Sequence, residues 1–177
     1  MPRLQTIDPA TATGPVKEIF DGPLKGKELN IFKGMGNSAA TLNAYLALSG
    51  ALAGGTFNAK EREVIQLAVG QANECAYCVA AHTQIGLGAG LTEAQTVGAR
   101  KGSVEGDDRL NALATFARAV RDKAGWVSDE DVDTFRNAGF DDGQVAEVIA
   151  NYSLAVFTNT FNHVNGTEVD FPAPPAL

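Results

Sequence analysis

The sequence predicts an all-α protein, and three observations carry this prediction. Apolar residues recur at helical spacing in several segments, as do Leu110, Leu113 and Phe116. A Ser, Thr, Asn or Asp precedes most of these segments at the position of an N-cap. No segment combines alternating apolar and polar residues with turn residues, so we expect no sheet.

The first part of the chain is expected to hold an irregular arm followed by helices of increasing length. Gly and Pro end the early helices, and short polar residues begin the later ones. In chain order we expect an irregular arm over residues 1–14, a short helix from Pro15 to the Gly22-Pro23 pair, a short helix around Leu29, Ile31 and Phe32, a helix from Ser38 to Gly54, and a helix that Asn58 begins with Glu61 in a capping box.

The second part continues in the same way and ends in an irregular tail. We expect Asn73 to be the N-cap of a helix over residues 74–86. The later helices are predicted to begin at Thr92 (with Gln95), at Asp107 or Asp108, at Ser128 (with Asp131) and at Asp141 (with Gln144), the last running to about Val164 before an irregular tail over residues 167–177.

Length and charge limit what the chain can be. A chain of 177 residues is expected to form one domain over residues 1–177. Its formal net charge of −7 argues against nucleic acid and anionic membranes as partners, since both require clustered Lys and Arg. No apolar run approaches the roughly 18 residues of a membrane span, and the N-terminus lacks the apolar stretch of a signal peptide. We therefore expect a cytoplasmic protein.

The two cysteines and one of the two histidines lie within eight positions of each other. Cys75 and Cys78 form a C-x-x-C motif, and His82 follows Cys78 by four positions. On a helix this spacing places all three side chains on one stripe. The start of a helix favours a thiolate, and His82 can exchange a proton with Cys78. A dithiol/disulfide redox centre is the interpretation that we favour.

Three other interpretations of this cluster stay open at the level of sequence. The cysteines can be small apolar core residues, although packing does not account for His82. Two Cys and one His can also bind Zn²⁺, for which only His163 offers a further His ligand. A static disulfide is disfavoured in a reducing compartment.

A carboxylate partner for His82 is available on the preceding helix. Glu63 shares a helix face with Gln66 and Leu67, and a surface position is the simplest alternative for it. A single straight helix would separate Glu63 from Cys78 by about 22 Å, at ~1.5 Å per residue. The two can meet only if the chain turns near residues 71–73 and the helices pack antiparallel. In that arrangement Glu63 lies nearly level with His82, and we expect a hydrogen bond between them.

The spacing of Glu63, the C-x-x-C motif and His82 resembles the motif of the alkylhydroperoxidase D-like (AhpD-like) branch of the carboxymuconolactone decarboxylase family. The start of the chain resembles the peroxidase-related members of that branch. So does its end, where Asn159, Asn162 and His163 precede the run from Thr167 to Pro172. The resemblance covers most of the chain and implies an AhpD-like helical fold, assembled into homo-oligomers such as trimers or hexamers.

The resemblance also implies a function, thiol-dependent reduction of a small hydroperoxide. It implies that Cys78 is the peroxidatic thiol, that Cys75 resolves it as a disulfide, and that Glu63 and His82 relay protons. The partner would be a dithiol reductant, lipoylated or thioredoxin-like, and no cofactor is implied beyond the redox-active disulfide. The family prototype has a second His between its cysteines, where this chain has Tyr77.

Several residues and functions remain alternatives. Tyr77 can pack or donate a hydrogen bond, and Asn162 and His163 can line the pocket or form the polar end of a helix. A general thiol–disulfide oxidoreductase or redox sensor would use the same residues. A decarboxylase or other lyase of the wider family would not require the C-x-x-C motif.

Overall fold

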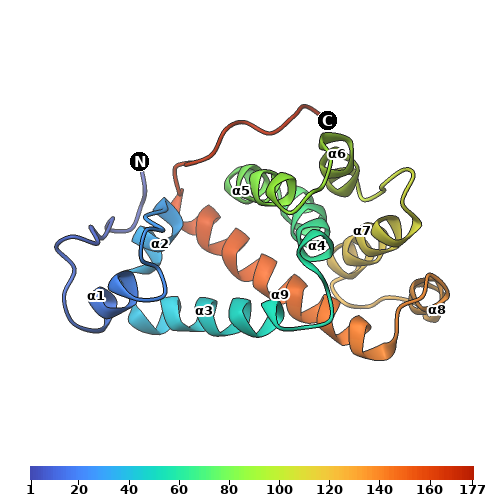
Figure 1. The fold of residues 1–177 in the computed structure, drawn as a ribbon, viewed down its shortest axis with the longest axis horizontal. Helices are drawn as coiled ribbons and strands as arrows, with labels where there is room; N and C mark the ends of the chain where they lie inside the picture. Colours follow the sequence, from blue (N-terminus) through green and yellow to red (C-terminus); the bar gives the residue numbers. More distant parts are fainter.

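The computed structural model describes residues 1–177 and contains nine α-helices and no strand, as predicted (Figure 1). The helices are α1 (Gly14–Asp21), α2 (Asn30–Met35), α3 (Ala39–Ala53), α4 (Ala59–Ala72), α5 (Ala76–Gly88), α6 (Glu93–Lys101), α7 (Asp108–Asp122), α8 (Asp129–Asn137) and α9 (Asp142–Asn165). None of them combines the length and hydropathy of a membrane-spanning segment.

Helix α4 lies at the centre of the molecule and packs against α5, α6, α7 and α9. Its residues from Val64 to Gly70 are all buried. An amphipathic surface helix would show a polar face, whereas this segment is apolar almost all round because neighbouring helices surround it. The long helix α9 packs against α4 and runs diagonally from α8 to the N-terminal helices (Figure 1).

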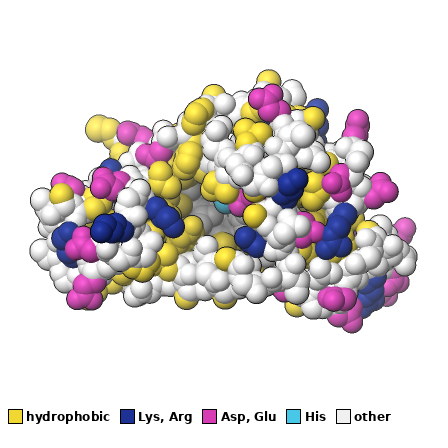
Figure 2. Space-filling model, viewed as in Figure 1, with side chains coloured by type: hydrophobic (Ala, Val, Ile, Leu, Met, Phe, Trp, Pro, Cys, Tyr) yellow, Lys and Arg dark blue, Asp and Glu magenta, His cyan; other side chains and the backbone are white.

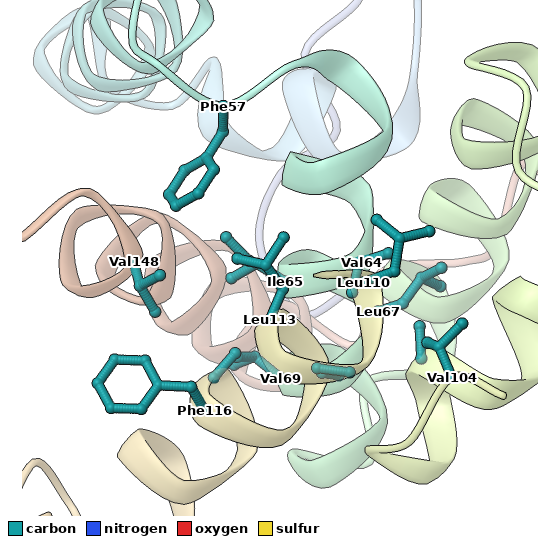
Figure 3. Packing of buried hydrophobic residues seen from close by; sticks show 14 of the residues in the cluster. Phe57, Val64, Ile65, Leu67, Val69, Val104, Leu110, Leu113, Phe116 and Val148 are labelled. Atoms are coloured by element: carbon teal, nitrogen blue, oxygen red, sulfur yellow. The ribbon is translucent and has the colours of Figure 1, made fainter. Parts of the chain in front are cut away.

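The main hydrophobic core forms around α4, α7 and α9 (Figure 3). Ile65, Leu113 and Val148 of these three helices are wholly buried. Three phenylalanines extend the core toward α8, with ring centroids 4.4 Å apart for Phe116 and Phe135 and 4.1 Å apart for Phe135 and Phe140. This rigid core positions α4, and α4 in turn carries Glu63.

The predicted N-caps are found at six helices. Each of these side chains accepts a hydrogen bond from the backbone N–H three residues later, which satisfies a donor that the helix itself cannot. The six N-cap residues are Ser38, Asn58, Thr92, Asp107, Ser128 and Asp141.

The prediction for the start of α5 was wrong. Asn73 is the C-cap of α4 rather than the N-cap of the next helix, and α5 begins at Ala76 with Cys75 as its N-cap. Between them the chain reverses at Glu74, which adopts a left-handed conformation with φ of 57°. The motif therefore lies two positions closer to the N-terminus of its helix than the sequence indicated.

Both ends of the chain are irregular but attached. The backbone N–H of Arg3 donates to the carbonyl of Asn165 at 2.6 Å, which ties the arm to the end of α9. The tail runs from α9 across α5 to α6 (Figure 1), where Arg100 donates to the carbonyl of Pro175 at 2.5 Å. The tail is thus held at its far end.

Candidate active site

Helices α4 and α5 form an antiparallel pair, as the position of Glu63 required. A Cβ on Gly70, near the end of α4, would lie 3.5 Å from the Cβ of Cys78 at the start of α5. A Cβ on Gly86, near the end of α5, would lie 3.6 Å from the Cβ of Glu63. Both distances are ordinary van der Waals contacts, so the two helices pack directly against each other at both ends of the site.

Cys75 and Cys78 are joined in a disulfide, with their Cα atoms 5.3 Å apart. As the N-cap, Cys75 also accepts a hydrogen bond through Sγ from the backbone N–H of Cys78, at 3.3 Å. Both residues are buried, with 1% of Cys75 and 3% of Cys78 exposed. Cys78 occupies the third position of α5, where the positive end of the helix dipole favours a thiolate after reduction.

The carboxylate of Glu63 contacts the imidazole of His82. Oε2 of Glu63 lies 2.6 Å from Nδ1 of His82, and only 12% of the Glu63 side chain and 21% of the His82 side chain are exposed. The expected contact between these residues is present. A carboxylate on Nδ1 fixes the orientation of the ring and leaves Nε2 to exchange a proton.

A cavity of about 260 Å³ joins the disulfide and this pair. Cys78, Glu63 and His82 all line it, whereas Cys75 does not. The remaining walls come from α2, α3, α9 and the tail, and are mostly apolar. Figure 2 shows the hollow near the middle of one face, bordered by hydrophobic side chains, with a histidine visible inside it. A small molecule in this cavity would meet Cys78 before Cys75.

Two adjacent residues of α9 have different positions. Asn162 is buried and lines the cavity, and its Nδ2 donates to Sγ of Cys78 at 3.3 Å. His163 is exposed, does not line the cavity, and belongs to a separate pocket that Arg121 and Asn159 also line. The suggestion that His163 lines the pocket is therefore corrected, since neighbours on a helix lie about 100° apart.

Tyr77 both packs and donates a hydrogen bond. Its hydroxyl donates to Oδ2 of Asp170 at 2.6 Å, and its ring meets that of Phe171 edge to face, with centroids 5.7 Å apart. Burial, and then the hydrogen bond to Asp170, raise the pKa of Tyr77, so its phenol remains a donor. Asp170 also accepts from the backbone N–H of Asn30 at 2.8 Å. One carboxylate thus joins the motif, the tail and α2.

Two residues of this site, Asp170 and Tyr45, could not be selected from the sequence. Asp170 lies in an irregular tail, and no local pattern links it to Tyr77. Tyr45 of α3 lines the cavity, and burial raises the pKa of its phenol despite a hydrogen bond with Ser49. Tyr45 falls within the helix expected from Ser38 to Gly54, and no local pattern distinguishes it there as a site residue. No group of three or more His, Cys, Asp or Glu side chains is arranged to hold a metal ion.

Residues 39–119 match the model of the carboxymuconolactone decarboxylase family. Over this segment, which we call the family segment, the chain is similar to the carboxymuconolactone decarboxylase family. The family segment runs from α3 into α7 and contains Glu63, both cysteines and His82. Asn162 and the tail lie outside it.

Solved structures share the fold over nearly the whole chain. The AhpD core protein of Ralstonia eutropha JMP134, described as peroxidase-related, has a TM-score of 0.84 at 22% identity, covering 96% of this chain and 92% of that chain. A peroxidase-related protein of Silicibacter sp. TM1040 has a TM-score of 0.77 at 19% identity, with coverage of 94% and 92%. The predicted AhpD-like fold is confirmed.

A third similar structure has a different name. It is a cysteine-to-alanine variant of the debrominase Bmp8 in complex with 2,3,4-tribromopyrrole, with a TM-score of 0.78, 15% identity, and coverage of 95% of this chain and 91% of that chain. No curated protein matches the sequence.

Proposed function

We propose that the protein is a thiol-dependent hydroperoxide reductase. One observation carries this proposal: the Cys75–Cys78 disulfide opens through Cys78 onto the same cavity as the Glu63–His82 pair. A peroxidatic thiol must meet its substrate next to a group that can protonate the leaving oxygen. The cavity brings these two requirements together in a space fit for a small organic molecule.

The reaction begins with the reduced dithiol. The thiolate of Cys78 attacks one oxygen of the hydroperoxide, the O–O bond breaks, and the sulfur becomes a sulfenic acid. The leaving alkoxide takes a proton from His82, which Glu63 orients, and departs as an alcohol. The thiol of Cys75 then condenses with the sulfenic acid, releasing water and forming the disulfide.

An external dithiol completes the cycle by thiol–disulfide exchange, so that one hydroperoxide and one dithiol give an alcohol, water and a disulfide. The protein requires no cofactor in this scheme beyond its own cysteines. A lipoylated or thioredoxin-like protein is the reductant that we expect, because either supplies the two thiols that exchange with a disulfide.

The protein is also expected to assemble as a homo-oligomer, a trimer or hexamer. Helix α3 has no charged residue, yet only Leu42 and Leu52 along it are buried. An apolar helix of this kind is normally covered, and a second copy of the chain would cover it. Light scattering at micromolar concentration is expected to give a multiple of 18.5 kDa. A species of 18.5 kDa would contradict this part of the proposal.

Peroxide consumption with several dithiol donors tests the proposed reaction. The Cys78→Ser variant is expected to lose turnover entirely. The Cys75→Ser variant should react once and then stop as a sulfenic acid or a higher oxidation product, which mass spectrometry detects. Full turnover by Cys78→Ser would show that the nucleophile is assigned wrongly. Disulfide exchange without peroxide consumption would indicate a general thiol–disulfide oxidoreductase or a redox sensor instead.

A second candidate function is reductive removal of a halogen from an aromatic ring. The similar debrominase structure contains a brominated pyrrole, and aromatic side chains line the present cavity, among them Phe32, Tyr45 and Phe171. In this reaction two thiols become a disulfide while the aryl halide becomes the arene and a hydrogen halide. Release of bromide from a brominated pyrrole, measured beside peroxide consumption with the same dithiol donors, separates the two functions.

A further inference from the structure

The polar groups of the cavity are distributed unevenly among the helices. The titratable and charged groups come from α3, α4 and α5, as Tyr45, Arg62, Glu63, Tyr77 and His82. Helix α9 contributes no charged group, but it presents amides and a hydroxyl to the cavity, and one of the amides reaches the disulfide. That amide belongs to Asn162.

We propose that Asn162 is a catalytic residue of the hydroperoxide reductase, whose side-chain N–H stabilises the thiolate of Cys78 and whose side-chain carbonyl accepts the O–H of the bound hydroperoxide. Only the acceptor role, in which Asn162 binds the hydroperoxide, rests on the proposed function. The donor role, in which the Asn162 N–H stabilises the Cys78 thiolate, concerns the dithiol itself and holds for any reaction that the dithiol performs.

The donor half follows from the contact with sulfur. Nδ2 of Asn162 lies 3.3 Å from Sγ of Cys78 and 3.9 Å from Sγ of Cys75, so the amide is nearer to the sulfur that lines the cavity. A disulfide sulfur is a weak, uncharged acceptor, and this contact contributes little in the oxidised state. After reduction the same amide faces a thiolate, and a hydrogen bond to a charged group is roughly twice as strong as a neutral one.

The acceptor half follows from an unsatisfied atom. Oδ1 of Asn162 is buried and has no hydrogen-bond partner, while 4% of the residue is exposed. Leaving such an acceptor unpaired destabilises a folded protein, so a partner that arrives with the substrate is the natural occupant. A hydroperoxide carries one O–H, and its hydrogen stays on the oxygen that is transferred to Cys78.

Asn162 and His82 act on different oxygens of the hydroperoxide. The oxygen attacked by Cys78 keeps its hydrogen and becomes the sulfenic O–H, which Oδ1 of Asn162 holds. The other oxygen leaves with the alkyl group and receives a proton from His82. One amide therefore aligns the sulfur and the transferred oxygen, which is the geometry that the attack requires.

The chain offers a matched control one turn earlier on the same helix. Asn159 is as buried as Asn162, with 1% exposed, but its Oδ1 accepts from Nδ2 of Asn73 at 2.9 Å, and the hydrogen bonds to the two sulfurs from this helix come from Asn162 alone. Replacing Asn159 by Ala perturbs a buried amide of α9 without touching the proposed donor. Any effect common to both positions reports on packing.

The experiment compares Asn162→Ala, the isosteric Asn162→Asp and the control Asn159→Ala. Thiolate absorbance near 240 nm, followed with pH in the Cys75→Ser background, reports the Cys78 thiolate without any substrate. Both Asn162 variants should raise the pKa of Cys78 and lower the thiolate-to-thiol ratio at neutral pH by about tenfold, and more in Asn162→Asp because its carboxylate repels the thiolate. Asn159→Ala should leave the ratio unchanged.

Two further readouts use the complete dithiol. Equilibration with dithiothreitol should favour the disulfide about tenfold more in Asn162→Ala, which corresponds to about 30 mV. Peroxide turnover of Asn162→Ala should remain at least about tenfold below wild type even at a pH where Cys78 is fully ionised, since the substrate contact is lost. Asn162→Asp retains the size of the side chain, so the thiolate readout survives if Asn162→Ala fails to fold.

The outcomes are distinguishable. A Cys78 thiolate that titrates identically in wild type and in both Asn162 variants overturns the donor role. Turnover of Asn162→Ala that returns to the wild-type rate at high pH overturns the acceptor role. A wild-type protein that consumes no hydroperoxide overturns the proposed function and with it the acceptor role, while the thiolate titration still decides the donor role.

Discussion

Replacing Glu63 by Gln removes one negative charge from the site and changes its shape very little. The Glu63 carboxylate lies 2.6 Å from Nδ1 of His82 in a partly enclosed position. The amide of Gln can still accept the hydrogen bond from Nδ1, so the orientation of the ring should survive. The loss is therefore electrostatic, and it concerns the charge that His82 carries while it acts as the proton donor.

The magnitude follows from the geometry of this pair. Two unit charges about 4 Å apart interact by about 4 kcal/mol at the effective dielectric constant of roughly 20 that suits such sites. Since each 1.36 kcal/mol corresponds to a factor of ten in rate, the full charge is worth about 10³-fold. We expect Glu63→Gln to lower peroxide turnover by roughly 10²–10³-fold, within the usual range for general acid–base catalysis.

The assay is steady-state peroxide consumption with a saturating dithiol, measured across pH, together with circular dichroism and light scattering. The matched control is Glu61→Gln on the same helix, because Glu61 pairs with Arg109 outside the cavity. That variant should lose stability but keep its rate per folded molecule. An unchanged rate and pH profile in Glu63→Gln would refute the relay through His82.

Three further predictions concern stability and are measured by urea unfolding. Gly70→Ala should stabilise the protein by about 0.5–1 kcal/mol, because Ala lowers the entropy of the unfolded chain and its Cβ would make an ordinary 3.5 Å contact. Gly98→Ala should destabilise the protein by about 1–3 kcal/mol, because its Cβ would lie 2.7 Å from the carbonyl oxygen of Ser103. Equal effects of the two substitutions would contradict both predictions. Glu74→Gly should stabilise by up to about 1 kcal/mol by relieving the positive φ of 57°, a gain that Glu74→Gln should not reproduce. The pKa of Tyr77 is raised in the folded protein, so above about pH 10 the unfolded chain loses the phenol proton while the folded chain keeps it, and the free energy of unfolding of the wild type should fall. Tyr77→Phe should show a shallower fall with pH. An identical dependence of stability on pH in the two proteins would refute this cause.

Local signals in the sequence predicted most of the fold. An N-cap and its helix are separated by only a few residues, so Asn58 and Asp141 could be recognised without knowing the tertiary structure. Asn73 misled the prediction because Asn favours both ends of helices. The left-handed residue that follows it is Glu74, whereas Gly or Asn would have indicated a reversal.

The site was predictable only where helix geometry constrained it. The contact between Glu63 and His82 followed from the rise per residue once the two helices were required to pair. Which of the neighbours Asn162 and His163 faces the cysteines depended on the rotation of α9, and the sequence does not determine that rotation. The contact of Tyr77 with Asp170 joins residues 93 positions apart, and only the closed tertiary structure brings them together.

The walls of the cavity come from two parts of the chain, one inside the segment that matches the family model and one outside it. The dithiol and the Glu63–His82 pair lie within the family segment, residues 39–119, whereas Phe32, Leu154 and Phe171 reach the cavity from outside it. Mutational drift in these outer walls can change the size and shape of the accepted molecule while the dithiol and its acid–base pair stay intact. The same division gives a protein engineer a short set of positions for retuning selectivity without rebuilding the reactive centre.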